Sequence, residues 1–200
     1  MPQSDLTHVI LVLDRSGSMG SVRDDAIGGF NTFVAQQAAA PGEATLTLVQ
    51  FDHEYEVVLR ALDMREVRPL DKKTYVPRGQ TALYDAVGRA VAETTEYVRK
   101  LPTARRPAKV IVAILTDGAE NASREYGYAD VQKLITRKRR AGWEFLFLGA
   151  NMDVVEAAAR IGIPSACSYA FDSTGEGTRA VFVRLADAVT AYRSTPRDED

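Results

Sequence analysis

Three short polar segments carry side chains whose types and spacing suit the binding of a metal ion. The first follows an apolar run and presents Asp14, Ser16 and Ser18. The second places Thr81 after a glycine-bearing stretch, and the third places Asp117 at the end of another apolar run. Carboxylate and hydroxyl oxygens are the ligands that hard cations such as Mg²⁺ prefer. Alternate residues of an extended chain point the same way, so the side chains of the first segment can aim at one centre.

Each segment taken alone also has a simpler explanation. Short runs of Asp, Ser and Gly are common in turns, and a turn explains the first segment equally well. A threonine before a helix often caps it, which is the simpler role for Thr81 alone. The combination is more informative, because two neighbouring buried strands that end in Asp14 and Asp117 would concentrate negative charge. Burying such charge is costly unless a cation neutralises it.

The apolar segments around these side chains predict an α/β fold. Strands are expected at 7–14, 44–51, 55–59, 109–116, 143–148 and 165–171, and helices at 21–37, 81–99, 128–140, 152–161 and 178–192. Continuously apolar strands are typical of a sheet covered on both faces. Their alternation with helices predicts a doubly wound, mostly parallel central sheet with helices on both faces. The short turn after residue 51 predicts one antiparallel edge strand.

This fold would bring the three segments to one edge of the sheet. In doubly wound sheets, ligands bind beyond the carboxyl ends of the strands, where the strand order reverses. Ser21 is expected to cap the first helix, and Thr81 to open the second. The polar stretch 63–78 is expected to form a long surface loop, and loops of that length are often functional.

The composition is that of an ordinary globular protein, with 46% hydrophobic and 26% charged residues. The 200 residues suit one domain, which we place at 1–194, followed by a charged tail at 195–200 that we expect to be disordered. The net charge of −2 does not indicate a nucleic-acid partner. Basic clusters at 99–106 and 133–140 are expected to be solvated helix ends.

The sequence also favours a cytoplasmic protein without membrane contact. No apolar run approaches the roughly 20 residues that span a bilayer, and the N-terminus lacks a signal-peptide pattern. The single cysteine, Cys167, excludes an internal disulfide and fits a reducing compartment. With only two histidines besides, a zinc site built from sulfur and nitrogen ligands is not expected.

The three polar segments have the sequences Asp14-x-Ser16-x-Ser18, Gly79-x-Thr81-x-Leu83 and Thr116-Asp117-Gly118. Together they resemble the three parts of the metal-ion-dependent adhesion site of von Willebrand factor A domains. Their order matches, and so does their context: strand to loop, loop to helix, strand to loop. The resemblance extends over about 7–192 and implies a Rossmann-like fold and a non-enzymatic module that binds proteins.

The resemblance also implies a role for each site residue. Ser16 and Ser18 would bind the cation directly, and Thr81 directly in one state and through water in another. Asp14 and Asp117 would act mainly through bound waters. Mg²⁺ is the favoured ion because it is small, octahedral and retains waters, with Mn²⁺ or Ca²⁺ as alternatives. A partner's Glu or Asp carboxylate would complete the shell, and intracellular members of the family commonly work in multiprotein assemblies.

Two other functions compete with this interpretation. Asp14 could be the nucleophile of a Mg²⁺-dependent phosphoryl-transfer enzyme. Haloacid-dehalogenase-type phosphatases, however, have a second carboxylate where this chain has Ser16, and a lysine near the later acidic loop, which 117–125 lacks. The chain also has no glycine-rich phosphate loop with a lysine. The third possibility is a structural subunit whose metal only stabilises the sheet.

Five further residues give weaker signals. Asn121 could orient the third segment, although a turn-forming role is the simpler interpretation. Asp52 and His53 end a strand on the same rim, but a hairpin turn accounts for them. Tyr126 and Tyr128 could be exposed contact residues, since aromatic residues are enriched at interfaces, or could pack in the core.

Overall fold

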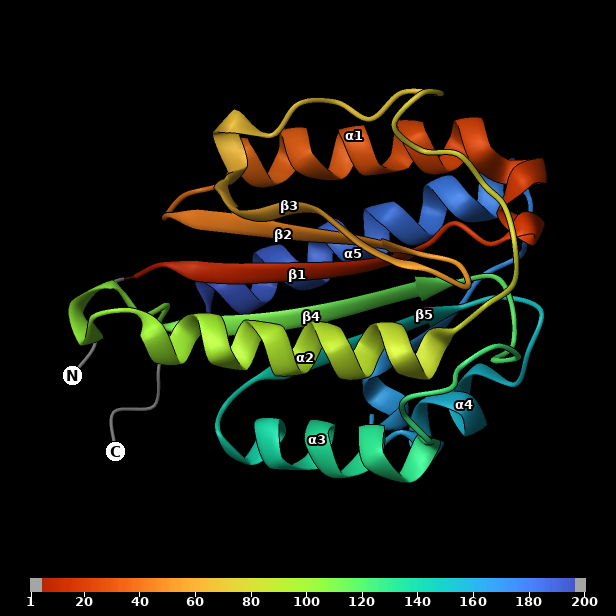
Figure 1. Cartoon of the computed structure of the whole chain (residues 1–200). Helices are drawn as coiled ribbons and strands as arrows, with labels where there is room; N and C mark the ends of the chain where they lie inside the picture. Colours follow the sequence, from red (N-terminus) through yellow and green to blue (C-terminus); the bar gives the residue numbers. More distant parts are fainter. Residues whose placement is uncertain (1–4, 197–200) are drawn as a thin grey trace.

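The computed structural model describes residues 5–196 and shows one central sheet of six strands (Figure 1). The strands are β1 (Thr7–Asp14), β2 (Ala44–Phe51), β3 (Tyr55–Asp63), β4 (Lys109–Thr116), β5 (Glu144–Gly149) and β6 (Ser168–Ala170). They lie in the order β3-β2-β1-β4-β5-β6, and all are parallel except β3, which pairs antiparallel with β2 at the edge. The predicted doubly wound, mostly parallel sheet with one antiparallel edge strand is confirmed.

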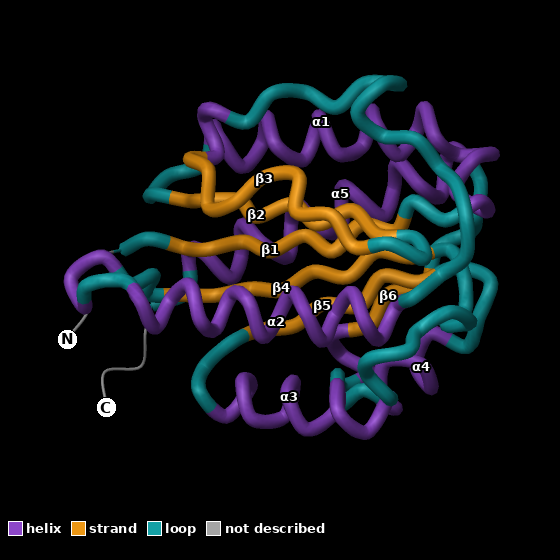
Figure 2. Tube along the Cα trace, in the orientation of Figure 1, coloured by secondary structure: helices purple, strands orange, loops and turns teal. Residues whose placement is uncertain are grey.

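Helices cover both faces of the sheet (Figure 2). They are α1 (Arg23–Ala39), α2 (Leu83–Lys100), α3 (Tyr128–Arg140), α4 (Val154–Arg160) and α5 (Gly175–Ser194). Helices α1 and α5 pack on one face, and α2, α3 and α4 on the other. In β1, Val9 and Leu11 face the first helix layer while Ile10 and Val12 face the second. Both faces of β1 are therefore buried, which explains its continuous apolar sequence.

Three helices, α1, α2 and α4, begin two residues later than the sequence predicts. Ser21 does not cap α1, because a 3₁₀ helix (Gly17–Val22) precedes α1 and the Ser21 hydroxyl donates instead to the carbonyl of Ser18 at 3.3 Å. Thr81 does not open α2, which begins at Leu83. The backbone amide and carbonyl of Thr81 are instead paired with the loop that follows β4.

Other boundaries shift for local reasons. Strand β3 continues to Asp63 rather than residue 59 because it follows β2 along its length, with an irregular register near Ala61, whose φ is 46°. The predicted strand at 165–171 is only the short β6, preceded by a 3₁₀ turn. Helix α5 begins before residue 178 because the side chain of Thr174 caps it. Helix α3 has the predicted bounds.

The polar stretch 63–78 is a loop with buried anchors. It begins with a 3₁₀ helix (Met64–Glu66), and Leu70 and Tyr75 are buried within it. Tyr75 is fully buried, and its hydroxyl donates to the carbonyl of Asp14 at 2.5 Å. Through Tyr75, the loop therefore holds the last residue of β1 in place.

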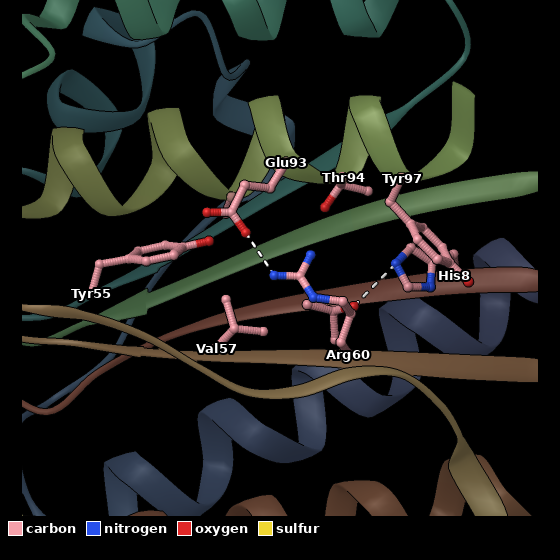
Figure 3. A pocket seen from close by; sticks show the side chains of 9 residues that line it. His8, Tyr55, Val57, Arg60, Glu93, Thr94 and Tyr97 are labelled. Carbon is pink, nitrogen blue, oxygen red and sulfur yellow. Dashed lines mark hydrogen bonds and ion pairs between the residues drawn. The ribbon is translucent and has the colours of Figure 1, made fainter. Parts of the chain in front are cut away.

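His8, at the opposite end of β1 from Asp14, is buried and lines a small cavity (Figure 3). His8 lies between two threonines, with Nδ1 at 2.8 Å from Thr45 Oγ1 and Nε2 at 3.3 Å from Thr47 Oγ1. The ring lies beside that of Tyr97. The cavity measures about 10 Å³, which is room for at most one water. Burial lowers the pKa of His8 to about 4, so the ring is neutral at physiological pH.

Within residues 5–196, no helix is long and apolar enough to cross a membrane. Most of the tail expected at 195–200 lies outside the described residues.

Candidate metal centre

The two aspartates that end apolar strands lie at the centre of one sheet edge. Strands β1 and β4 are parallel neighbours, with Leu13 opposite Leu115, so Asp14 and Asp117 leave the sheet at almost the same level. The strand order reverses between these two strands, since β2 and β3 lie beyond β1 while β5 and β6 lie beyond β4. The structure therefore places both carboxylates at the topological switch point, where ligands of such sheets bind.

Asp14 is held from three directions. Its Oδ1 accepts the amide of Ser16 at 2.6 Å, and its Oδ2 accepts the hydroxyl of Thr116, on β4, at 2.6 Å. The Tyr75 hydroxyl holds its carbonyl from the other side. Asp14 has no exposed surface. Its carboxylate is thus fixed in the floor of the site.

Burial raises the pKa of the Asp14 carboxyl to about 6. Hydrogen bonds from Thr116 and Ser16 work against that rise, and the nearby charge of Asp117 adds to it. The charged form is therefore disfavoured in the metal-free protein. A divalent cation would reverse this preference by favouring the carboxylate.

The three predicted hydroxyls lie around the second aspartate. Ser18 Oγ donates to Asp117 Oδ1 at 2.5 Å and lies 3.1 Å from Ser16 Oγ. Thr81 Oγ1 and Ser18 Oγ flank Gly118: a Cβ built on this glycine would lie 3.2 and 3.6 Å from them. The structure thus brings all five predicted residues together, from three loops. Ser18 is exposed and the other four are buried.

The donor set consists of two carboxylates and three hydroxyls. Within the described residues there is no group of three or more His, Cys, Asp or Glu side chains that could hold a metal. An ion here would depend on hydroxyls, waters and an external ligand. Oxygen ligands with few carboxylates suit Mg²⁺, which keeps several waters.

Backbone contacts join the first loop, which follows β1, to the second loop, which precedes α2. The amide of Gly17 donates to the carbonyl of Gly79 at 3.1 Å, and the amide of Arg78 donates to the carbonyl of Arg15 at 2.8 Å. Gly79 has a φ of 68°, and a Cβ at this position would lie 2.1 Å from His53 Nδ1. Glycine is therefore required at this point of the second loop, because the backbone is left-handed and the His53 ring of the β2–β3 turn leaves no room for a side chain.

Sequence reasoning missed an ionic clamp beside the site. Asp52, which has no exposed surface, accepts Nε of Arg15 at 3.0 Å and Nε of Arg78 at 2.9 Å through the same Oδ2. Its Oδ1 accepts the amide of Glu54 at 2.6 Å, which is the expected turn role. Burial raises the pKa of Asp52, but Arg78, the Glu54 amide and Arg15 outweigh it and hold that pKa below its usual value. The available signal was that Asp52 also follows a buried strand on this edge.

Asn121 orients the third loop, which follows β4 and spans 117–127. From sequence alone, a turn-forming role is the simpler interpretation of this residue. Its Oδ1 accepts the amide of Thr81 at 2.9 Å, and its own amide donates to the carbonyl of Thr81 at 3.0 Å. Two further residues reach Asp117 from the loops after β5 and β6. Asn151 Nδ2 donates to its carbonyl at 3.0 Å, and Ser173 Oγ lies 3.3 Å from its Oδ2.

The two tyrosines near the third loop differ. Tyr126 is half-buried and packs against Gly88 of α2, so close that a Cβ there would meet the tyrosine ring at 2.5 Å. Tyr128 is 50% exposed, with the guanidinium of Arg160 at 5.3 Å from its ring centroid. Only Tyr128 is therefore available as a contact residue.

Comparisons with known proteins point to one family. The model of the von Willebrand factor type A domain matches residues 8–182. No curated protein sequence matches the chain. Among solved structures, proximal thread matrix protein 1 from the mussel byssus, described with a zinc-occupied MIDAS motif, superposes with a TM-score of 0.63 at 15% identity. The match covers 94% of this chain and 46% of that protein, so this chain spans about half of that relative.

Two other solved structures extend the comparison. The manganese-loaded TRAP protein of Plasmodium vivax has a TM-score of 0.62 at 15% identity, over 91% of this chain and 73% of that one. The von Willebrand factor domain of a type V pili tip protein from Porphyromonas gingivalis has a TM-score of 0.65 at 10% identity, over 98% and 99%. At such identities the likeness concerns the fold.

Proposed function

The chain belongs to the von Willebrand factor type A domain family, and from this premise we propose that it is a non-enzymatic module that binds a protein partner through a divalent cation. One observation carries the proposal: the carboxylates of Asp14 and Asp117 and the hydroxyls of Ser16, Ser18 and Thr81 converge at the switch point of the sheet. Within residues 5–196, neither aspartate has a basic side chain as an ion-pair partner, so the charge of this cluster is not balanced by the described part of the chain.

We assign the hydroxyls of Ser16 and Ser18 as direct ligands, the hydroxyl of Thr81 as a ligand that binds directly in one state and through water in another, and Asp14 and Asp117 as residues that act mainly through waters. Mg²⁺ is our first choice of ion, with Mn²⁺ or Ca²⁺ as alternatives. Solved proteins of the same fold are described with zinc and with manganese, so both ions belong in the test. When bound, the ion would offer an open position to a carboxylate of the partner, because few charged ligands would neutralise it.

The burial of Asp14 argues against the phosphoryl-transfer alternative. A nucleophilic carboxylate must reach the phosphorus of a substrate. Both oxygens of Asp14 are already hydrogen-bonded, to Ser16 and Thr116, and the residue has no exposed surface. Its position suits support of the metal shell rather than attack on a substrate.

Cellular context remains part of the proposal. We propose that the protein is cytoplasmic and that it has neither a nucleic-acid nor a membrane partner. We also propose that it works within a multiprotein complex. The single cysteine supports a reducing compartment. The similar solved proteins include a matrix protein and a pilus-tip protein, but at 15% and 10% identity they are related to this chain by fold alone.

Calorimetry with Mg²⁺, Mn²⁺ and Zn²⁺ tests the metal site, and the chain offers a matched pair of variants. Ser18 and Ser21 are both exposed serines of the same 3₁₀ helix, but only the hydroxyl of Ser18 contacts Asp117. We expect Ser18→Ala to weaken binding by at least tenfold and Ser21→Ala to leave it unchanged. Equal affinities for the two variants would refute the site.

The open coordination position is tested with acetate as a probe. Water protons relax quickly beside Mn²⁺ that carries exchangeable waters, so a carboxylate that replaces one of them should lower the relaxivity. We expect acetate to lower the relaxivity of the Mn²⁺-bound wild type in a saturable way. A relaxivity unaffected by acetate would contradict carboxylate binding, and metal-dependent hydrolysis of p-nitrophenyl phosphate would favour an enzyme.

A further inference from the structure

Helix α2 begins without a cap of its own. The residue before it, Ala82, provides no side-chain hydrogen bond, although the first amides of a helix need acceptors. The amide of Tyr84 donates to Glu120 Oε2 at 3.0 Å, and the amide of Asp85 donates to Ser123 Oγ at 3.0 Å. Both acceptors belong to the third loop (117–127), so this loop supplies the missing cap.

Helix α2 in turn shapes the third loop. The carboxylate of Asp85 accepts three consecutive backbone amides of the loop, at 2.8 Å from Arg124, 2.9 Å from Glu125 and 2.8 Å from Tyr126. Three successive amides on one carboxylate fix the path of the loop at that point. The start of α2 and the loop therefore depend on each other.

Glu120 organises the near half of the same loop. Its Oε1 accepts the amides of Ala122 at 2.9 Å and Ser123 at 2.7 Å, and its Oε2 accepts the Ser123 hydroxyl at 2.7 Å. Together with the amide of Tyr84, the half-buried carboxylate of Glu120 receives four hydrogen bonds. A glutamine, with one oxygen in place of two, could not satisfy them all.

The connection reaches the metal centre at Thr81. Asn121 pairs with both the amide and the carbonyl of Thr81, and the Thr81 hydroxyl lies beside Gly118 of the same loop. If Thr81 moved without the third loop, both of its hydrogen bonds to Asn121 would break. Thr81 would also separate from the loop that caps α2. The third loop, Thr81 and the first turn of α2 thus form one connected unit.

We propose that Glu120, Asn121 and Asp85 are positioning residues that hold the Thr81 hydroxyl against the Asp117 loop before the ion arrives. The proposal rests on the proposed metal-binding function. Ligands that are already in place lose less conformational freedom on binding, which raises affinity. None of the three side chains needs to touch the ion, since their effect passes through Thr81 and the loop.

Charge-matched variants of the third loop test this role. Glu120→Gln and Glu125→Gln each remove one negative charge from the loop, but Glu125 is exposed, and Arg89 is the one partner of its carboxylate in the part of the chain that the structure describes. We expect Glu120→Gln and Asn121→Ala to weaken Mn²⁺ binding by about 10- to 100-fold, the usual effect of removing a supporting contact around a metal site. Glu125→Gln should bind Mn²⁺ as the wild type does.

The Mn²⁺ affinity, measured by calorimetry well below the unfolding temperature, separates positioning from plain stability. If the Glu120 and Asn121 variants melt earlier in EDTA but bind Mn²⁺ with wild-type affinity, the positioning role is refuted while the metal site stands. If the wild type and Glu125→Gln bind none of the ions, the proposed function itself fails, and this inference with it.

Hydrogen exchange on the wild type tests the proposal without any variant. In EDTA the amides of Thr81, Tyr84 and Asp85 should already exchange slowly and at similar rates, because the unit is held together before the ion arrives. Fast exchange of these three amides in EDTA, with protection appearing only when Mn²⁺ binds, would overturn the inference even though the metal site stands.

Discussion

Replacing Asp14 by asparagine should stabilise the metal-free protein at neutral pH while removing its metal affinity. Asparagine has the shape of the neutral carboxyl and keeps an oxygen for the amide of Ser16. The Thr116 hydroxyl can turn to donate to the carbonyl of Gly118, which lies 3.0 Å away, and accept from the new amide group. The substitution therefore removes a disfavoured charge and keeps the hydrogen-bonding pattern.

The magnitude follows from the raised pKa of Asp14. A carboxyl whose pKa rises from 3.8 in the unfolded chain to about 6 in the fold binds protons more tightly when folded. Its protonation therefore stabilises the fold fully below the unfolded pKa, and this contribution is lost as the pH rises through 6. Over the whole interval the loss is about 3 kcal/mol, of which about 1.4 kcal/mol falls between pH 5 and 7.5.

Urea unfolding in EDTA at pH 5 and pH 7.5 measures the effect. The stability difference between Asp14→Asn and the wild type should grow by about 1.4 kcal/mol on going to the higher pH. Other titrating groups, including His8, are common to both proteins and cancel in the difference. Asp187→Asn, which removes a charge from an exposed position, should show no such change.

Addition of Mg²⁺ should reverse the order of stability. The wild type gains stability from a bound ligand, about 4.1 kcal/mol at 1,000 times the dissociation constant, which exceeds its deficit of about 3 kcal/mol, and the variant should gain none. A stability difference that does not depend on pH would refute the electrostatic reasoning. An Mg²⁺-dependent gain of equal size in both proteins would refute the role of Asp14 at the ion.

Two further predictions concern residues that support the fold around the site. Tyr75→Phe removes the hydroxyl that holds the Asp14 carbonyl and should cost about 1–2 kcal/mol, or a melting temperature lower by about 2–8 °C, whereas Tyr128→Phe at a half-exposed position should change little. Equal melting temperatures would contradict the Tyr75 contact. His8, with its pKa lowered from 6.5 to about 4, should make the wild type lose stability as the pH falls through that interval, and His8→Gln should flatten this loss in urea titrations. An unchanged slope would mean that His8 can be protonated in the fold.

The fold was predictable because its strongest constraint is local in sequence. A strand covered on both faces must be apolar throughout, and β1 and β4 show this as continuous runs. The alternation of such runs with amphipathic helices then restricts the topology to few choices. Two of the residues predicted for the metal site shared this advantage, because Asp14 ends the run of β1 and Asp117 directly follows the run of β4.

The supporting contacts could not be predicted because they join distant parts of the chain. Asp85 lies within a helix, and its sequence context gives no sign that it accepts three amides that lie 39 to 41 residues away. Thr81 was expected to cap α2, since an N-cap is a local interaction that sequence can suggest. The cap comes instead from Glu120 and Ser123, whose partners only the folded chain reveals.

Three aspartates on one sheet edge show how the fold distinguishes a structural carboxylate from a ligand. Asp52 is paired with two guanidinium groups, Arg15 and Arg78, and its pKa stays low despite burial. Within residues 5–196, no ion pair joins Asp14 or Asp117 to a basic side chain; they meet only hydroxyl and amide donors. All three carboxylates are buried, so they differ not in exposure but in whether a basic side chain lies beside them. The chain neutralises Asp52 itself and supplies no basic side chain to Asp14 or Asp117, which supports our proposal that these two, and not Asp52, belong to the cation site.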